Sequence, residues 1–394
     1  SAIQAALQQG GKEWGRSRIM IVGEGRAGKT ALSNSLIGKP YQATESTVGI
    51  NQLICDVHYA SGGKGGWNPY QKPEKELEAA VASMVAEQNK NGNYCVNNSA
   101  DDSVVPVVAK QYSSDDYVDI VSSSVVTEVD EELVMKCLAS SIETVSDLVV
   151  SVFDYGGQSV FNVIHHLFLT QNGVYVLAFN MEWLLGDGEE KAQCLAYLQF
   201  WTNSIYVHTY NAETNTAAPV VMVGTRKDRV SSPKDHERIS TIIYETFSHS
   251  KIWPSILDNS LAEGINGTIT MWFYPVDNTL ARNDPTVQQL MSTVEAAMNA
   301  NAFTRKKVPL PWLQVVDEMQ ARQKPCLSLD EVYDIACKKC GIVRDHVPCL
   351  LHFLHEMGIA LWHDEAGLRD VVILDAVAYF VTPATRVICK HVPD

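Results

Sequence analysis

The sequence predicts an α/β fold with a mainly parallel sheet and a phosphate-binding loop, followed by a smaller, mostly helical domain. An apolar run, 19–22, stands directly before the glycine-spaced loop GEGRAGKT at 23–30. Further β-type runs alternate with helical segments up to about residue 276, as a mainly parallel sheet with right-handed crossovers requires. After residue 300, apolar residues recur mostly with the helical period.

The chain is too long for one ordinary domain, since it has 394 residues. We expect an N-terminal helix and linker at 1–17, an α/β domain at 18–300, and a helical domain at 301–394. An insertion at about 61–145 interrupts the α/β domain. The first residue is Ser1 and not an initiator Met, which predicts a fragment of a longer protein.

Composition excludes several classes of protein. The net charge of -15 repels phosphate backbones and argues against nucleic acid as a partner. No apolar stretch approaches the roughly 18 residues that a transmembrane segment needs, and the N-terminus lacks the form of a signal peptide. Nine scattered cysteines indicate reduced thiols. We therefore expect a cytoplasmic protein.

The loop GEGRAGKT has every position of the G-x-x-x-x-G-K-T pattern between a predicted strand and a predicted helix. Its glycines let successive backbone N–H groups point at phosphate oxygens. Lys29 supplies a positive charge, and the hydroxyl of Thr30 is a ligand for Mg²⁺. The alternative is a glycine-rich turn that binds nothing.

A second strand, LVVSVF at 148–153, ends at Asp154, which is followed by Gly157 and Gln158. Asp154 is placed to hold Mg²⁺ through water, the Gly157 N–H to sense a γ-phosphate, and Gln158 to orient an attacking water. Upstream, the hydroxyl of Thr47 is a candidate to close over Mg²⁺ and γ-phosphate. Ordinary loop residues are the alternative at each position.

Two later strands end in residues suited to a nucleotide base. APVVMVGTRKD brings Asp228 to a strand end, where its carboxylate can accept two hydrogen bonds from guanine that adenine cannot offer. A charged, solvated turn is the alternative. The last strand, in TMWFYPVDNTL, ends at Asp277 and Asn278, beside the expected position of the base.

One cluster resembles a zinc site, and the insertion is ambiguous. Cysteines and histidines crowd into CKKCGIVRDHVPCLLHFLHEMG, yet they also fit the apolar faces of two helices, of which Gly341 ends the first. We favour packing. The insertion contains amphipathic stretches with Leu77, Val81, Met84 and Val85 on one face. It is either a solvated elaboration or a docking surface for a partner.

GEGRAGKT, STVGI, DYGGQSVF and GTRKD resemble, in order, the guanine-nucleotide motifs of Ras-like GTPases, and more narrowly of the Roc domain of the Roco family. VPLPWLQVVDEM, LDEVYDIACKKCGI and the segment around LLHFLHEMGIALW look like the first, winged-helix-like part of the COR domain that follows Roc. The resemblance covers residues 14–60 and 145–300 and continues beyond them.

Carried over residue by residue, the resemblance implies three groups of site residues. The expected catalytic residues are Gln158, Lys29 and Thr47, and the expected Mg²⁺ ligands are Thr30, Thr47 and Asp154. The expected nucleotide contacts are Gly23, Gly25, Arg26, Ala27, Gly28, Lys29, Thr30, Ala31, Gly157, Thr225, Lys227, Asp228, Asp277 and Asn278. Departures from the Ras-like pattern are Thr225–Arg226 in place of Asn-Lys, and VDN in place of Ser-Ala-Lys.

The resemblance further implies slow hydrolysis of GTP as a conformational switch, with GTP/GDP and Mg²⁺ as cofactors. In the family this unit dimerises through COR within larger proteins that act in signalling. Since dimerisation depends on the later part of COR, the fragment is compatible with a monomer. Alternatives are a catalytically weak, nucleotide-stabilised scaffold for interaction or dimerisation, an ATP-using NTPase, and a nucleic-acid-binding winged helix.

Overall fold

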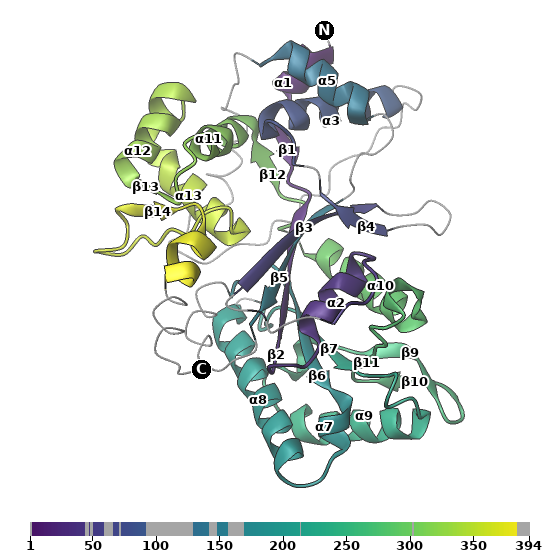
Figure 1. Ribbon diagram of the computed structural model, residues 1–394. Coiled ribbons are helices and arrows are strands. Elements are labelled where there is room, and N and C mark those ends of the chain that lie inside the picture. Colours follow the sequence, from purple (N-terminus) through teal and green to yellow (C-terminus); the bar gives the residue numbers. More distant parts are fainter. Residues whose placement is uncertain are drawn as a thin grey trace. The chain divides into compact units, whose positions relative to one another are not determined.

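The computed structural model describes most of the chain, in two units (Figure 1). The described residues are 2–43, 47, 50–58, 66–70, 72–91, 129–141, 148–156, 169–212, 214–301 and 303–383. Contacts divide the chain into a unit formed by Arg16–Tyr70, Leu148–Asn301 and Phe380–Asp394, here called the sheet unit, and one formed by Ser1–Gly15, Gln71–Asp147 and Ala302–Tyr379, here called the helical unit.

The sheet unit is built on one mixed sheet whose strand order is β11-β7-β6-β2-β5-β3-β4, with β8 also paired to β7. In chain order the strands are β2 (Arg16–Gly23), β3 (Ile50–His58), β4 (Gly66–Pro69), β5 (Leu148–Tyr155), β6 (Val174–Asn180), β7 (Val220–Thr225), β8 (Ile256–Leu257) and β11 (Tyr274–Pro275). Only the pairings of β3 with β5 and of β4 with β3 are antiparallel. The predicted mainly parallel sheet is therefore confirmed.

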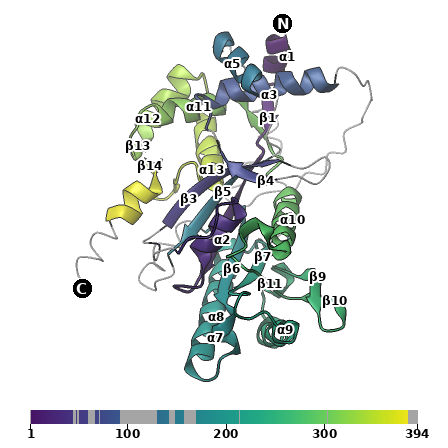
Figure 2. The same cartoon turned by 45° about the vertical axis from the view of Figure 1, so that its right-hand side comes forward.

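Helices cover both faces of this sheet, because its central strands are apolar on both sides. The helices of the sheet unit are α2 (Lys29–Leu36), α7 (Met181–Leu185), α8 (Glu189–Thr209), α9 (Pro233–Phe247) and α10 (Pro285–Ala300). Buried residues of α2 and α10 share one core cluster with Ile19 and Ile21 of β2. On the other face, Trp201 of α8 contacts Tyr155 edge-on, with ring centroids 6.4 Å apart. Figures 1 and 2 show α8 on one side of the sheet and α2 and α10 on the other.

Short elements complete the sheet unit. These are η3 (Trp253–Ser255), the antiparallel hairpin of β9 (Asn259–Gly264) with β10 (Gly267–Met271), and η4 (Ala281–Asn283). Strand β4 belongs here too, although its residues fall inside the segment predicted as an insertion. It is held by Trp67, which is fully buried and donates from Nε1 to Glu295 at 2.6 Å.

The helical unit combines three separate stretches of chain. Its elements are α1 (Ala2–Gln8), β1 (Gly11–Glu13), α3 (Glu76–Asn91), α5 (Glu131–Ser141), β12 (Lys307–Pro309), α11 (Leu310–Gln320), β13 (Cys326–Ser328), α12 (Leu329–Tyr333), η5 (Asp334–Lys339), η6 (Arg344–His346), α13 (Val347–Met357) and β14 (Val371–Ile373). The division between the units falls within η7 (Val377–Val381), after Tyr379. Strand β1 pairs antiparallel with β12, and β13 with β14. The N-terminal segment expected as helix and linker therefore also supplies a strand.

An aromatic core joins these stretches. The ring of Phe353 lies 5.4 Å from Trp14, 5.3 Å from Trp312 and 5.6 Å from Phe303, measured between centroids. The same core cluster takes in the predicted apolar face of α3, which is Leu77, Val81, Met84 and Val85. The apolar face of the insertion is thus confirmed, and α3 packs with α1, α5 and α11.

One carboxylate of α11 caps the beginning of α3. Asp317 accepts hydrogen bonds from the backbone N–H groups of Glu76 at 2.8 Å and Leu77 at 3.1 Å. Burial raises the pKa of Asp317 to about 6, opposed by these two bonds and assisted by the negative charges of Glu76 and Glu78. The cap therefore carries a titratable group that changes its charge near neutral pH.

We expect this carboxyl to make the helical unit less stable as pH rises from 5 to 7. The folded chain binds the proton up to pH about 6, whereas an unfolded aspartate releases it near pH 4. Stability therefore decreases with pH wherever the folded state holds more protons. Denaturant unfolding at pH 5, 6 and 7 measures this, and Asp317→Asn should flatten the profile.

Glu331→Gln provides the control. Its hydrogen bond to Lys324 lowers the pKa of Glu331 to about 2, so that its charge is constant over the whole window. This variant should keep the wild-type slope. A wild-type slope in Asp317→Asn would show that other groups govern the pH dependence.

Candidate functional site

A pocket of about 600 Å³ opens in the sheet unit at the carboxyl ends of β2, β5 and β7. It is lined by Gly25, Arg26, Gly28, Lys29, Thr30, Ala31, Tyr41, Ala43, Thr47, Tyr155, Thr225, Arg226, Asp228, Arg229, Asn278 and Thr279. The carboxyl edge is where open α/β sheets bind ligands. The structure therefore brings together most of the residues predicted from separate motifs.

The loop between β2 and α2 is fixed by close backbone packing. Gly23 has φ 141°, and a Cβ there would overlap the carbonyl oxygen of Ala178 on β6. Gly28 ends the loop with φ 82° and serves as the N-cap of α2. Arg26 adopts the left-handed conformation with φ 63° and is exposed. The glycines are thus required by geometry, whereas Arg26 is held in a costly conformation at the rim of the pocket.

Lys29 is folded back onto the loop. Its ammonium donates to the carbonyl oxygens of Gly23 at 3.0 Å and Glu24 at 2.7 Å, and the residue is 5% exposed. Burial lowers the pKa of Lys29 to about 8, and the negative charges of Asp154 and Glu24 oppose this change. A buried cation at the beginning of a helix suits a phosphate group as its counter-charge.

Three oxygen-bearing side chains from three different segments converge beside Lys29. The hydroxyl of Thr30 donates to Oδ2 of Asp154 at 2.7 Å, and the hydroxyl of Thr47 donates to the same oxygen at 3.1 Å. The two hydroxyl oxygens lie 2.9 Å apart. These are the three residues that the sequence predicted as Mg²⁺ ligands, and the structure brings them together.

The carboxylate of Asp154 can accept a further ligand. The residue is 1% exposed, and within the described residues its buried Oδ1 has no hydrogen-bond partner. Burial raises the pKa of Asp154, opposed by the bond from Thr30, the charge of Lys29 and the bond from Thr47. Hydroxyl and carboxylate oxygens are the donors that Mg²⁺ prefers, and a cation would satisfy the free oxygen. The residues therefore fit such an ion.

Thr225 is directed to the phosphate-binding loop. Its hydroxyl contacts the carbonyl oxygens of Ala27 at 2.8 Å and Phe179 at 3.1 Å, and the residue is 1% exposed. A Cβ on Gly28 would come within 3.3 Å of its methyl group. Thr225 of β7 therefore stabilises the position of the loop, in addition to lining the pocket.

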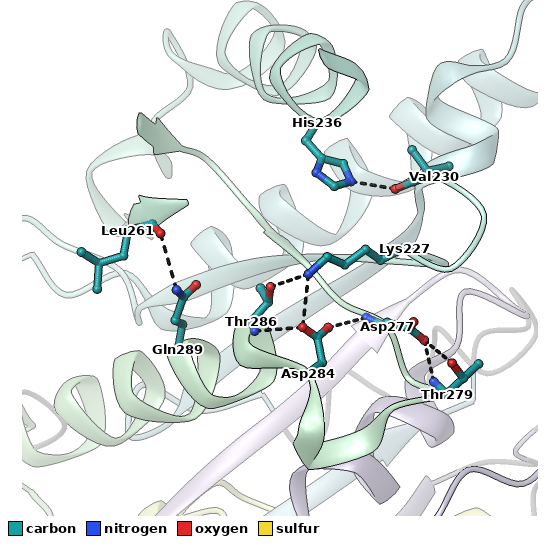
Figure 3. Close-up of polar contacts among 9 residues, drawn as sticks. All are labelled: Lys227, Val230, His236, Leu261, Asp277, Thr279, Asp284, Thr286 and Gln289. Atoms are coloured by element: carbon teal, nitrogen blue, oxygen red, sulfur yellow. Dashed lines mark hydrogen bonds and ion pairs between the residues drawn. The ribbon is translucent and has the colours of Figure 1, made fainter. Parts of the chain in front are cut away.

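Among the described residues, four predicted nucleotide contacts do not line the pocket, namely Gly23, Ala27, Lys227 and Asp277. Lys227 donates from Nζ to Asp284 and Thr286, and the carboxylate of Asp277 accepts from the backbone and hydroxyl of Thr279 (Figure 3). The side chain of Lys227 is therefore engaged by the first turn of α10 (Pro285–Ala300), and that of Asp277 by its own loop. The sequence pattern placed them at the right strand ends but could not give the direction of their side chains.

Asp228 and Asn278 do line the pocket. The side chain of Asp228 is 33% exposed and lies 3.9 Å from Nε of Arg229. Asn278 is buried and accepts at Oδ1 from the hydroxyl of Ser35 in α2, at 3.1 Å. This hydrogen bond connects the loop after β11 to α2, the helix that follows the phosphate-binding loop.

Six lining residues were not predicted from the sequence. These are Tyr41, Ala43, Tyr155, Arg226, Arg229 and Thr279. The last four each directly follow a predicted site residue, so their position in the sequence was a usable signal. Tyr41 and Ala43 carry none, because their segment has no motif. Gly157 and Gln158 lie outside the described residues, as does the rest of 157–168.

The cysteine and histidine cluster packs in the core of the helical unit. Cys340 and Cys349 are buried in it, Cys337 packs against it, and Gly341 has φ 67° at the end of η5. Across the described part of the chain, no group of three or more His, Cys, Asp or Glu residues could hold a metal ion. In the same residues, no helix is both long and apolar enough to cross a membrane.

Fold and pocket together define a P-loop nucleotide-binding protein with a Ras-like α/β domain and a smaller helical part. The nucleotide-binding class is supported by the loop, the buried lysine and the converging oxygens at the carboxyl edge of the sheet.

Comparison with known proteins extends this result. No protein-family model matches the chain. It is 23% identical over 229 residues to the probable serine/threonine-protein kinase roco5 of Dictyostelium discoideum, covering 57% of this chain and 7% of that protein. It is 20% identical over 238 residues to a Roc-COR-CHAT protease of an unknown prokaryotic organism, covering 60% of this chain and 20% of that protein. The chain thus spans only a small part of these relatives.

A solved structure, that of Methanosarcina barkeri Roco2 RocCORdC bound to GDP, shares the fold. The TM-score is 0.55 at 14% identity, over 97% of this chain and 79% of that one. The relatives in sequence and structure are thus Roco proteins and a Roc-COR protein. The chain is related to the Roc–COR region of the Roco family, and the resemblance read from its motifs is confirmed.

Removing the hydroxyl of Thr225 should loosen the phosphate-binding loop. Thr225→Val keeps the shape but leaves the carbonyls of Ala27 and Phe179 without this donor, which should cost about 1–2 kcal/mol of unfolding free energy. Denaturant unfolding of the nucleotide-free protein measures the loss. Thr202→Val is a matched control, since that buried hydroxyl donates to Leu198 inside α8, where the helix already supplies an N–H. Equal losses in both variants would contradict a specific bracing role.

Proposed function

We propose that this chain binds GTP and GDP together with Mg²⁺ and hydrolyses GTP slowly, as a conformational switch within a larger signalling protein. The observation that carries the proposal is the convergence of the Thr30 and Thr47 hydroxyls on the buried carboxylate of Asp154. It lies beside a buried Lys29 at a glycine-rich loop, which is the arrangement that phosphoryl transfer requires.

The groups on the phosphate side of the pocket each have a role in binding the nucleotide and its metal ion. Backbone N–H groups of the loop and the ammonium of Lys29 bind the phosphate oxygens. Thr30, Thr47 and Asp154 would hold Mg²⁺, directly or through water, and the ion would neutralise charge that develops on the phosphates. Thr47 contacts this centre from a separate segment, which makes its position responsive to the γ-phosphate.

The base side selects guanine in this proposal. The carboxylate of Asp228 lines the pocket and offers two acceptor oxygens to N1–H and the 2-amino group of guanine. Adenine presents an unprotonated N1 at that position and carries no 2-amino group. The GDP in the Roco2 structure supports guanine for this chain as well.

Hydrolysis needs an oriented water. We assign that task to Gln158, with Gly157 contacting the γ-phosphate; the assignment rests on the DYGGQ motif. The water oxygen forms a bond to the γ-phosphorus as the bond to the β–γ bridging oxygen breaks, which gives GDP and inorganic phosphate. Loss of the γ-phosphate then releases Thr47 and the segment from Gly157 to Leu169.

The family resemblance supports the wider context. We propose that the full-length protein dimerises through later parts of COR, that the fragment can be a monomer, and that the protein is cytoplasmic. A nucleotide that is bound but not turned over would make the same unit a scaffold.

Single-turnover assays with GTP and ATP test the enzyme directly. We expect Mg²⁺-dependent release of phosphate from GTP only. Lys29→Ala should weaken GTP binding by about 100-fold, because a buried charge-assisted contact is lost. Gln158→Leu should leave binding intact and lower the rate by about tenfold or more.

Two outcomes of this assay would contradict parts of the proposal. GTP bound in a Lys29-dependent way without phosphate release would favour the scaffold. Release from ATP at the same rate as from GTP would exclude guanine selection by Asp228.

Replacing the carboxylate of Asp228 should change which base the pocket prefers. In Asp228→Asn the amide donates where the carboxylate accepted, which suits the carbonyl at position 2 of xanthine in place of the amino group of guanine. We expect GDP affinity to fall about 100-fold and XDP affinity to rise, as measured by competition with a fluorescent nucleotide. Asp187→Asn, at an exposed position of the same unit, should change neither affinity. Unchanged GDP binding in Asp228→Asn would remove Asp228 from the base site.

A further inference from the structure

The base-side wall of the pocket is made by two loops that run beside each other. The first follows β7 and carries Asp228, and the second follows β11 and carries Asn278. Their backbones are paired where they begin, since Val276 donates to Gly224 at 2.7 Å and Lys227 donates to Val276 at 3.2 Å. The position of one loop therefore depends on the position of the other.

Asp284 binds both loops and the first turn of α10. Its Oδ1 accepts from the backbone N–H of Thr286 at 3.0 Å, as an N-cap, and its Oδ2 accepts from the backbone N–H of Asp277 at 2.7 Å. The ammonium of Lys227 lies 3.2 Å from Oδ1 and donates to the hydroxyl of Thr286 at 2.8 Å. Figure 3 shows Lys227, Thr286 and Asp277 around the carboxylate of Asp284.

These contacts exceed what a helix cap needs. An N-cap uses one oxygen on one backbone N–H, and serine does this as well as aspartate. Here the second oxygen reaches back to Asp277 at the beginning of the second loop. The negative charge, on a residue that is 1% exposed, is balanced by Lys227 of the first loop. A buried carboxylate is tolerated only when it is paired and hydrogen-bonded, so these partners are held closely.

The held residues stand next to the pocket residues. Lys227 directly precedes Asp228, and Asp277 directly precedes Asn278. The far end of the first loop is fixed separately, because the ring of His236 contacts the carbonyl oxygen of Val230 at 2.7 Å. Asp284 therefore constrains the part of each loop that faces the pocket.

We propose that Asp284 is a positioning residue for base recognition. It holds Lys227 and the backbone of Asp277. In this way it fixes the carboxylate of Asp228 and the side chain of Asn278 in the positions that recognise one particular base. The proposal rests on the proposed binding of guanine nucleotide. Asp284 does not line the pocket, so its effect on the base passes through these two neighbours.

Asp284→Ser separates positioning from capping. The serine hydroxyl can still cap α10, but it is too short to reach Asp277 and carries no charge for Lys227. GDP and IDP, which differ only in the 2-amino group, are compared by competition for a fluorescent nucleotide. We expect wild type to prefer GDP by about tenfold or more, and the variant to lose most of that preference. A purely structural role would weaken both nucleotides by the same factor and leave the ratio unchanged.

Controls keep the outcome decisive. Asp130→Ser is a matched substitution at the cap of α5, where Asp130 accepts from Leu133 at 3.0 Å, and it should leave the ratio at the wild-type value. Asp284→Asn keeps the volume and one acceptor and should shift the ratio in the same direction as Asp284→Ser, which covers the case of a serine variant that does not fold. Folding of each variant is checked by its thermal unfolding.

The results distinguish the two proposals. A folded Asp284 variant with the wild-type preference for GDP over IDP overturns the positioning role alone. Wild-type protein that binds GDP, IDP and ADP equally overturns guanine recognition, and the role of Asp284 with it. Loss of the preference in the Asp284 variants alone supports both.

Discussion

The phosphate-binding loop depends on one steric constraint, the absence of space beside Gly23. Strand β2 lies between β5 and β6 in parallel register, and its last residue abuts the carbonyl oxygen of Ala178 so closely that no side chain fits. From β7, the hydroxyl of Thr225 contacts the loop at Ala27. The conformation of the loop is therefore fixed by β2, β6 and β7 of the sheet.

The chemistry of the pocket follows from burying charges at this edge. Asp154 and Lys29 are both withdrawn from water, and burial shifts the pKa of each toward the neutral form. Their opposite charges partly compensate, and two hydroxyls contact the carboxylate. One oxygen of Asp154 remains without a partner among the described residues. Such a centre is stabilised when a cation and a phosphate complete it, which couples ligand binding to the stability of the sheet unit.

The base side is organised differently, through hydrogen bonds between loops. Asp284 was not predicted as a site residue, because an aspartate before Pro285 is the ordinary start of a helix. Lys227 and Asp277, which were predicted, are bound to Asp284 and Thr279 and do not line the pocket. Here sequence spacing identified the loops correctly. Of the side chains predicted in them, Asp228 and Asn278 line the pocket, whereas Lys227 and Asp277 do not.

The sequence alone determined the local features whose physics is short-range. These include the strand and glycine loop at 19–30, Asp154 and Asp228 at strand ends, the apolar face of α3, and the cysteines that pack in a core. Only the tertiary structure decided the partners of these features. It brought Thr47 to Asp154, directed Thr225 to Ala27, and joined α1, α3 and α11 around one core. The reason is that periodicity and spacing specify which face of an element is buried, whereas the partner of that face depends on contacts between residues far apart in the chain.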